Sequence, residues 1–164
     1  MRQNKRQSLL EDAFISLFER REATEIPENI VMLFLKYFRR IAGIEIYIYN
    51  EKKNSLILRL HKGISPDYFG SGVLKPGEKV AGFVAEKEQP LFSNHVTDQT
   101  FISHPVLQKG KAASCAGIPL YFRKKLIGVI GLYSQQRGYF TEERKEKCLD
   151  LQLPVSIGLG NFLE

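Results

Sequence analysis

The sequence holds only two cysteines, Cys115 and Cys148, and they lie in different segments of the chain. No Cys-x-x-Cys pair and no histidine-rich spacing accompanies them, so neither a zinc site nor a disulfide framework is predicted. Such sparing use of cysteine fits a reducing compartment, and we expect a cytoplasmic protein.

Long apolar runs are also lacking. The longest, 126–133, has eight residues including two glycines, far short of the ~20 residues that cross a bilayer. The basic N-terminus leads into an amphipathic segment rather than an apolar signal core, so neither export nor a membrane partner is expected.

The charge is only modestly one-sided: 24 Lys and Arg residues against 18 Asp and Glu residues give a formal net charge of +6. The basic residues stand in small separated groups with no long basic stripe, which indicates solvated surface and no direct nucleic-acid partner. With 164 residues, 43% hydrophobic content and no low-complexity tract, the chain is predicted to form a single domain over 1–164.

Two helices are expected within residues 8–41. Apolar residues recur at steps of three and four between 8 and 21, which is typical of an amphipathic helix. Pro27 suits the first turn of a second helix, since its missing N–H costs nothing there, and Gly43 ends that helix.

A last helix is expected over 141–163. Thr141 is a good N-cap, and the acidic residues that follow it suit the helix dipole. Pro154 should kink this helix, and close approach to another helix would explain Gly158 and Gly160.

The segment 43–134 is expected to hold the sheet. Residues 44–49 and 56–61 alternate with a period of two and predict a hairpin. We expect the aliphatic side chains of both strands to share the face that covers the helices, namely Ile44, Ile46, Ile48, Leu56, Leu58 and Leu60. The opposite face then presents Tyr47, Tyr49, Arg59 and His61.

Smaller elements follow. We expect a loop over 63–77 with a short strand near 72–74, a helix over 78–87, a strand over 90–95 and a short helix within 100–109. A second hairpin then joins 112–122 to 125–134. Its return strand is apolar on both faces, which indicates a central strand covered on each side. The fold class is therefore α+β: three α/β/α layers around an antiparallel sheet of five or six strands.

Several phrases resemble the GAF domain, a small-molecule sensor module of signalling proteins. In order they are Leu74-Lys-Pro-Gly-Glu-Lys-Val-Ala-Gly-Phe-Val-Ala-Glu-Lys-Glu-Gln-Pro-Leu, Ser93-Asn-His-Val-Thr-Asp-Gln-Thr-Phe, Ile118-Pro-Leu, Leu126-Ile-Gly-Val-Ile-Gly-Leu-Tyr and Tyr139-Phe-Thr-Glu-Glu. The resemblance implies that the first, second and last helices cover one face of the sheet. On the other face it implies a pocket roofed by the 64–77 loop and two short helices.

Within that implied pocket, seven residues are candidates for ligand binding. They are Tyr47, Tyr49, Phe69, Phe83, Asn94, Phe101 and Ser114. The aromatic members would line a cavity, with the asparagine and the serine as polar partners. The alternative is a filled second hydrophobic core without a ligand.

Catalysis is not expected, and no catalytic residue is assigned. A GAF-like enzyme reduces free methionine sulfoxide, but such chemistry needs an attacking thiolate and a resolving thiol within reach. The family plan places Cys115 in a strand and Cys148 on the opposite layer, so the second thiol is missing. Bilin attachment is also disfavoured, because Cys115 is followed by Ala116 rather than histidine. GAF domains that bind cyclic nucleotides carry a dispersed Asn-Lys-Phe-Asp-Glu signature. Asn94 followed by His95 resembles only its opening, so cyclic-nucleotide binding stays open as an alternative without further support.

No metal or cofactor is expected either. His95 and His104 flank the second short helix and could meet across a loop, but two histidines without a carboxylate cluster are more often solvated. His61 beside Arg59 could contact an anionic ligand or lie exposed on an edge strand.

The resemblance thus favours a non-catalytic sensor that binds an unidentified small molecule. It also implies a homodimer, formed through the first and last helices, that signals to an output domain such as a histidine kinase, a cyclic-dinucleotide enzyme or a transcription regulator. The alternatives are a ligand-free dimerisation scaffold and, less favoured, a free methionine sulfoxide reductase.

Overall fold

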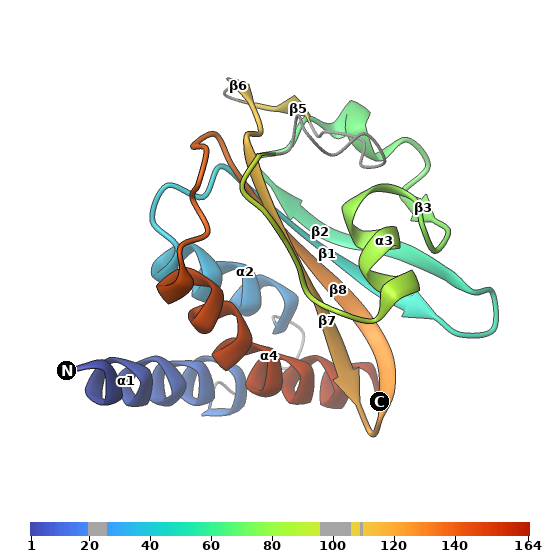
Figure 1. The fold of residues 1–164 in the computed structure, drawn as a ribbon. Coiled ribbons are helices and arrows are strands. Elements are labelled where there is room, and N and C mark those ends of the chain that lie inside the picture. Colours follow the sequence, from blue (N-terminus) through green and yellow to red (C-terminus); the bar gives the residue numbers. More distant parts are fainter. Residues whose placement is uncertain (20–25, 96–105, 109) are drawn as a thin grey trace.

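A six-stranded antiparallel sheet, with strand order β3-β2-β1-β8-β7-β4, lies at the centre of the computed structural model (Figure 1). The structure describes residues 1–19, 26–95, 106–108 and 110–164. The strands are β1 (Gly43–Asn50), β2 (Ser55–Lys62), β3 (Val73–Leu74), β4 (Leu91–Ser93), β7 (Ser114–Phe122) and β8 (Lys125–Ser134). A separate two-stranded sheet pairs β5 (Val106–Leu107) with β6 (Gly110–Lys111).

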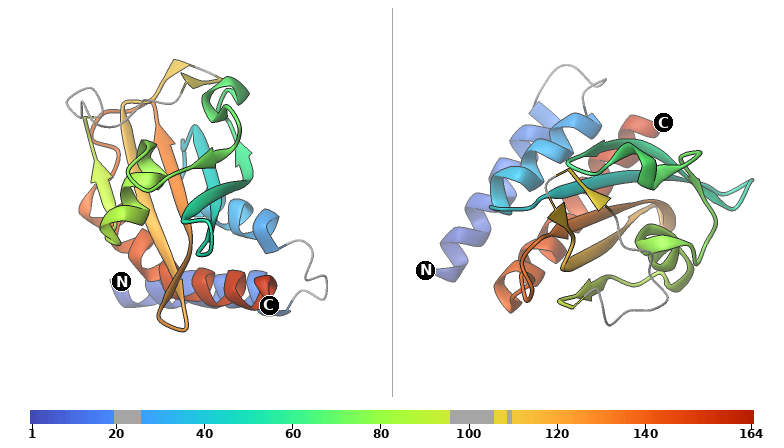
Figure 2. Two further views of the ribbon diagram at one scale, coloured as in Figure 1. Left: turned by 90° about the vertical axis from the view of Figure 1, so that its right-hand side faces the viewer. Right: turned by 90° about the horizontal axis from the view of Figure 1, so that it is seen from above.

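Helices cover both faces of the sheet, as Figures 1 and 2 show. On one side are α1 (Arg2–Phe14), a π-helical turn η1 (Ile15–Glu19), α2 (Ile26–Tyr37) and α4 (Glu142–Leu163). On the other side are the 3-10 turn η3 (Pro66–Phe69) and α3 (Lys79–Lys87). The predicted three-layer α+β architecture is confirmed, and the first helix begins at Arg2, earlier than the apolar periodicity indicated.

The helical side holds the larger hydrophobic core. Its centre is the stripe of α4 packed against β7 and β8, comprising Cys148, Leu151, Val155 and Leu159 with Ile118, Leu120, Ile130 and Leu132. The expected cap is present, since the Arg144 N–H donates to Thr141 Oγ1 at 3.3 Å. Figure 1 shows that α4 bends part way along its length. Pro154 inside the helix accounts for a bend, because it lacks an N–H and crowds the preceding turn.

α1 and α4 lie side by side and run in the same direction. Near the start of α1, Arg6 Nε lies 3.1 Å from Oδ1 of Asp150 in the first half of α4. Farther along, where η1 continues α1, a Cβ on Gly158 would lie 3.4 Å from Leu17 Cβ. A Cβ at Gly158 would thus make ordinary van der Waals contact, so the close approach of this helix pair does not depend on the glycine. A Cβ on Gly160 would instead overlap the Phe122 ring at the end of β7, so this second glycine accommodates the sheet rather than a helix.

One expectation about the first hairpin is wrong. Leu60 pairs with Ile46, but the next pair is Leu58 with Tyr47, so β2 carries a bulge at Arg59. A bulge shifts the alternation by one residue, and residues beyond it change faces. Leu60 packs on the helical side, whereas Leu56 and Leu58 join the opposite core.

Arg59 moves with the bulge. Its guanidinium lies 5.7 Å from the ring centroid of Phe162 in α4, so it is on the helical side and not beside His61. Of the expected second short helix, residues 100–105 and 109 lie outside the described residues, and Val106–Leu107 form a strand rather than a helix. In the parts of the chain that the structure describes, no helix combines the length and apolarity needed to cross a membrane.

Candidate functional site

One row of paired residues crosses the sheet face beneath α3. Residues that pair across neighbouring strands project from the same face of a sheet. In order across the sheet, the row consists of His61 of β2, Glu45 of β1, Gly131 of β8, Gly117 of β7 and Leu91 of β4. A Cβ on Gly131 would overlap the Glu45 carboxylate, and one on Gly117 would overlap α3. The two glycines therefore leave space for a buried carboxylate and for the close approach of a helix.

Glu45 is the unusual member of this row, since its residue is only 1% exposed. The Tyr133 hydroxyl donates to Glu45 Oε1 at 2.5 Å, while Oε2 has no hydrogen-bond partner among the described residues. Burial raises the pKa of Glu45 to about 7, although the Tyr133 hydrogen bond and the charge of Lys79 act in the opposite direction. The carboxyl group thus changes protonation state near neutral pH.

Other polar groups surround this carboxylate, and we call Glu45, Tyr47, His61, Cys115 and Tyr133 the Glu45 cluster. The Tyr47 hydroxyl and the Nδ1 atom of His61 are buried and lack partners within the described residues. Burial and the charge of Glu45 raise the pKa of the Tyr47 hydroxyl, and they raise that of the Cys115 thiol to about 12. Three polar atoms without partners therefore belong to one small region.

Aromatic and basic groups from η3 and α3 border the cluster. The Phe69 ring lies 4.3 Å from the His61 ring, centroid to centroid. The Lys79 ammonium donates to the Tyr68 carbonyl and lies 4.1 Å from the centroid of the Tyr68 ring. Burial and then the charge of Glu45 raise the pKa of Tyr68, which places that phenol within electrostatic reach of the carboxylate.

The structure brings only some of the predicted ligand-binding residues together. Tyr47 and Phe69 are buried in the core beneath α3, and Tyr49 packs at its edge with its hydroxyl donating to Asn54 Oδ1 at 2.7 Å. Phe83 is half-buried on α3, with the Lys87 ammonium 6.0 Å from its ring centroid. Phe101 lies outside the described residues.

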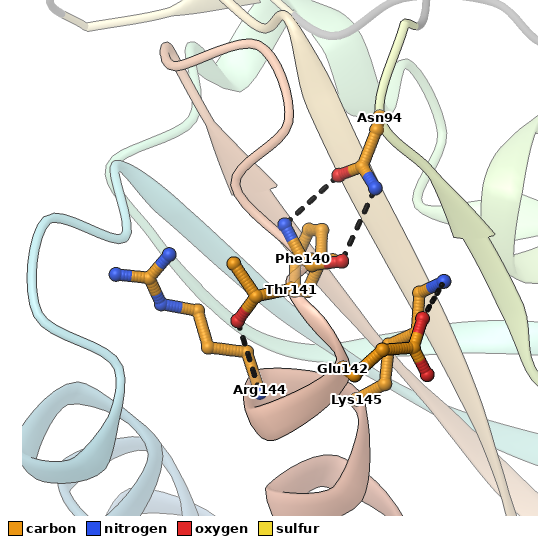
Figure 3. Close-up of polar contacts among 6 residues, drawn as sticks. All are labelled: Asn94, Phe140, Thr141, Glu142, Arg144 and Lys145. Atoms are coloured by element: carbon orange, nitrogen blue, oxygen red, sulfur yellow. Dashed lines mark hydrogen bonds and ion pairs between the residues drawn. The ribbon is translucent and has the colours of Figure 1, made fainter.

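The two predicted polar partners, Asn94 and Ser114, anchor the segment that leads into α4. Asn94 Nδ2 donates to the Phe140 carbonyl at 3.1 Å, and the Phe140 N–H donates to Asn94 Oδ1 at 2.9 Å, as Figure 3 shows beside the Thr141 cap. Ser114 Oγ donates to the Gln136 carbonyl at 2.6 Å. A substitution at Ser114 would therefore disrupt this anchor rather than fill a pocket.

Replacing Asn94 with alanine tests the anchor. The variant leaves the Phe140 N–H and carbonyl without their side-chain partner, so we expect the free energy of unfolding to fall by about 1–3 kcal/mol. Urea unfolding measures this difference. Asn4→Ala, at an exposed position in α1, is the control and should change stability by less than about 0.5 kcal/mol; equal stability of the two variants would show that the anchor is unimportant.

The two cysteines lie in different cores, and His95 is engaged by an arginine. Cys115 belongs to the core beneath α3 and Cys148 to the core on the helical side, and both are free and buried. Burial raises the pKa of each thiol to about 12, so both are protonated at neutral pH. His95 Nδ1 accepts from Arg137 Nε at 3.1 Å, while His104 lies outside the described residues.

Sequence reasoning missed Glu45 because it read the residue as the polar half of an alternating strand. The available signal was that 126–133 is apolar on both faces, so any strand beside it is also covered on both faces. Gly131 and Gly117 leave space on this face, but only the strand order shows that Glu45 lies beside them. Among the described residues, no group of three histidine, cysteine or acidic side chains is arranged to hold a metal ion.

Two hollows lie along α1, away from the α3 face. One of about 720 Å³ lies between α1 and the first half of α4, and another of about 610 Å³ follows the outer side of α1 and η1. Large apolar side chains are exposed on these elements, namely Phe14, Ile15, Phe18, Leu149 and Leu153.

Comparisons with known proteins agree with this architecture. A family model described as GAF domain matches residues 27–146. The structure resembles the GAF domain of a phosphoenolpyruvate-protein phosphotransferase from Coxiella burnetii, with a TM-score of 0.81 and 17% identity over 95% of this chain and 93% of that chain. It resembles the corresponding GAF domain from Acinetobacter with a TM-score of 0.79 and 17% identity over 96% of this chain and 94% of that chain. It also resembles free methionine-R-sulfoxide reductase from Neisseria meningitidis, with a TM-score of 0.75 and 14% identity over 94% of this chain and 87% of that chain. A search of curated proteins found no match.

Proposed function

Because the chain belongs to the GAF domain family, we propose that it is a non-catalytic sensory domain which binds a small molecule beneath α3. Binding changes the packing of α1 and α4 in a homodimer, and an output domain or partner in the cytoplasm responds. The observation that carries this proposal is the Glu45 cluster, whose Glu45 Oε2, Tyr47 hydroxyl and His61 Nδ1 atoms are buried without partners in the described part of the chain. Buried polar atoms are normally hydrogen-bonded, so such a group indicates a place for a ligand.

β7 provides a physical connection between the ligand side and the helical side. Its Gly117 lies against Val84 of α3. On the other face, Gln152 of α4 donates to the Pro119 carbonyl at 2.7 Å, and the Tyr121 N–H donates to Ser156 Oγ at 3.2 Å. A ligand that moves α3 thereby alters a strand held directly by α4. The ligand shifts the equilibrium between two packings of α1 and α4 in the dimer only as far as its affinities for the two packings differ.

Native mass spectrometry of the freshly purified chain tests both parts of the proposal. We expect a dimer, with added mass when a ligand is retained. A dimer without added mass that also gains no thermal stability from any small molecule in a metabolite library would favour the ligand-free scaffold. A monomer would contradict transmission through paired helices.

A single substitution tests the location of the dimer interface. Leu153 is 67% exposed on α4, and burying an aspartate there against a second subunit leaves an unpaired charge. Leu153→Asp should therefore raise the dimer dissociation constant at least about tenfold, equal to about 1.4 kcal/mol, as measured by analytical ultracentrifugation. Met32→Asp, at a similarly exposed site on α2 (61%), is the control and should stay dimeric; the reverse pattern would place the interface on α2.

The likeness to free methionine-R-sulfoxide reductase gives a second candidate activity. Reduction of a sulfoxide by this chain would depend on Cys115, the cysteine located beneath α3. We expect no turnover of free methionine sulfoxide with a dithiol reductant, because the thiol is protonated and its would-be partner lies on the other face. Turnover that disappears in Cys115→Ser would replace the sensor proposal with the enzyme.

A further inference from the structure

The chemical nature of the ligand can be approached from the atoms that lack partners. Glu45 Oε2, when ionised, only accepts hydrogen bonds; a neutral His61 can accept at Nδ1; and the Tyr47 hydroxyl can accept or donate. Glu45 and His61 are direct cross-strand neighbours, and Tyr47 follows on the same face of β1. The cluster therefore offers acceptors to a group that carries several N–H donors.

The charge of the region points the same way. Glu45 receives one hydrogen bond from a neutral phenol, and no ion pair joins it to any basic side chain in the described residues. Lys79 is the basic residue whose charge acts on it, yet the Lys79 ammonium bonds the Tyr68 carbonyl instead. A buried carboxylate without a cation is unfavourable, and a cation that reaches it is strongly favoured.

The surrounding rings suit a cation as well. Tyr47, Tyr68, Phe69 and Tyr133 belong to or border this core, and the faces of aromatic rings attract ammonium groups. The chain itself provides an example, since the Lys79 ammonium lies 4.1 Å from the Tyr68 ring centroid. An anionic ligand such as a phosphate ester would instead lie against the Glu45 carboxylate and be repelled.

We infer that the ligand is a small organic cation with a primary ammonium group, held by Glu45 Oε2 together with the Tyr47 hydroxyl and the surrounding aromatic rings. This inference rests on the proposed sensory function and specifies the class of molecule that is sensed. The pKa of Glu45, raised to about 7 by burial, implies that binding strengthens as the pH rises and the carboxyl ionises.

Matched pairs of probes test the inference at pH 8 by ¹⁵N–¹H NMR titration. The pairs are 2-phenylethylammonium with 2-phenylethanol and n-butylammonium with n-butanol, which differ in charge at nearly constant size. We expect at least one cation to shift amides of β1, β8 and α3 and to bind at least tenfold more tightly than its alcohol. The same cation should bind more weakly at pH 5.5.

Two variants test whether the Glu45 cluster binds the cation, and a third is the control. Glu45→Gln keeps the shape of the side chain and should remove the preference for the cation. Tyr47→Phe keeps the packing and should weaken cation binding about fivefold. It provides the test of the cluster if Glu45→Gln fails to fold. Glu51→Gln removes an exposed carboxylate in the turn after β1 and should change nothing.

Equal binding of cation and alcohol, unchanged cation binding in Glu45→Gln and Tyr47→Phe, or no binding of either cation would each overturn the inference. If the mass spectrum or the amide shifts then reveal a bound molecule without a basic nitrogen, the sensory function stands and only the ligand class is wrong. If no small molecule shifts the amides of this face, the sensory function falls with it.

Discussion

The free energy of unfolding should fall by about 3 kcal/mol as the pH rises from 4.5 to 7, because of Glu45 alone. Burial raises the pKa of this carboxyl from 4.5 to about 7 in the native protein, so in this range the folded chain holds a proton that the unfolded chain has lost. The stabilisation is complete below pH 4.5, declines through the interval and is absent above pH 7; a shift of one pKa unit corresponds to about 1.4 kcal/mol.

Urea unfolding of the wild type and Glu45→Gln across pH 4–8 measures this effect. The difference between the two curves isolates Glu45, since the groups that face it are the same in both: Tyr47, His61, Tyr68, Lys79, Cys115 and Tyr133. We expect the difference to vary with pH in the stated interval. Parallel curves would mean that Glu45 titrates like an exposed residue.

Replacing Gly117 with leucine should destabilise the fold by at least about 3 kcal/mol. Even a Cβ at this position would overlap Val84 of α3, and overfilled cores force side chains and backbone to shift. We expect the α3 layer to separate from β7 while α4 keeps its contacts on the other face. Urea unfolding gives the magnitude, and hydrogen exchange should show faster exchange in α3 than in α4.

The double variant Gly117→Leu with Val84→Ala checks the cause. Removing the Val84 methyl groups makes room for the new side chain, so the double variant should be more stable than the sum of the two single changes predicts. Additive losses would show that the damage arises in the strand itself and not from contact with α3.

Local signals predicted most of the fold. Thr141 and the apolar periodicity located α4, and the two hairpins followed from alternation and their turns. The bulge at Arg59 could not be predicted in this way, because Leu56, Leu58 and Leu60 satisfy a regular strand equally well. Tertiary contacts distinguish the two registers, such as the packing of Arg59 on Phe162 of α4, 103 residues later in the chain.

The site was less predictable than the fold. Strand alternation and the family resemblance placed Tyr47 and Phe69 on the face beneath α3, and the structure buries both there, whereas Asn94 holds the Phe140 backbone. Glu45 became visible only when strand order placed it between β2 and β8. The chemistry of a carboxylate depends on its neighbours across the sheet, and a single sequence does not name them.

The parallel arrangement of α1 and α4 gives this domain a mechanical property. The two chain termini lie at opposite ends of the helix pair (Figure 1), so tension applied between them pulls the helices past each other along their length. All contacts between the helices, from the Arg6–Asp150 ion pair to Leu17 on Gly158, then bear load at the same time. Tension along this axis therefore loads the contacts in shear and does not peel them apart one after another.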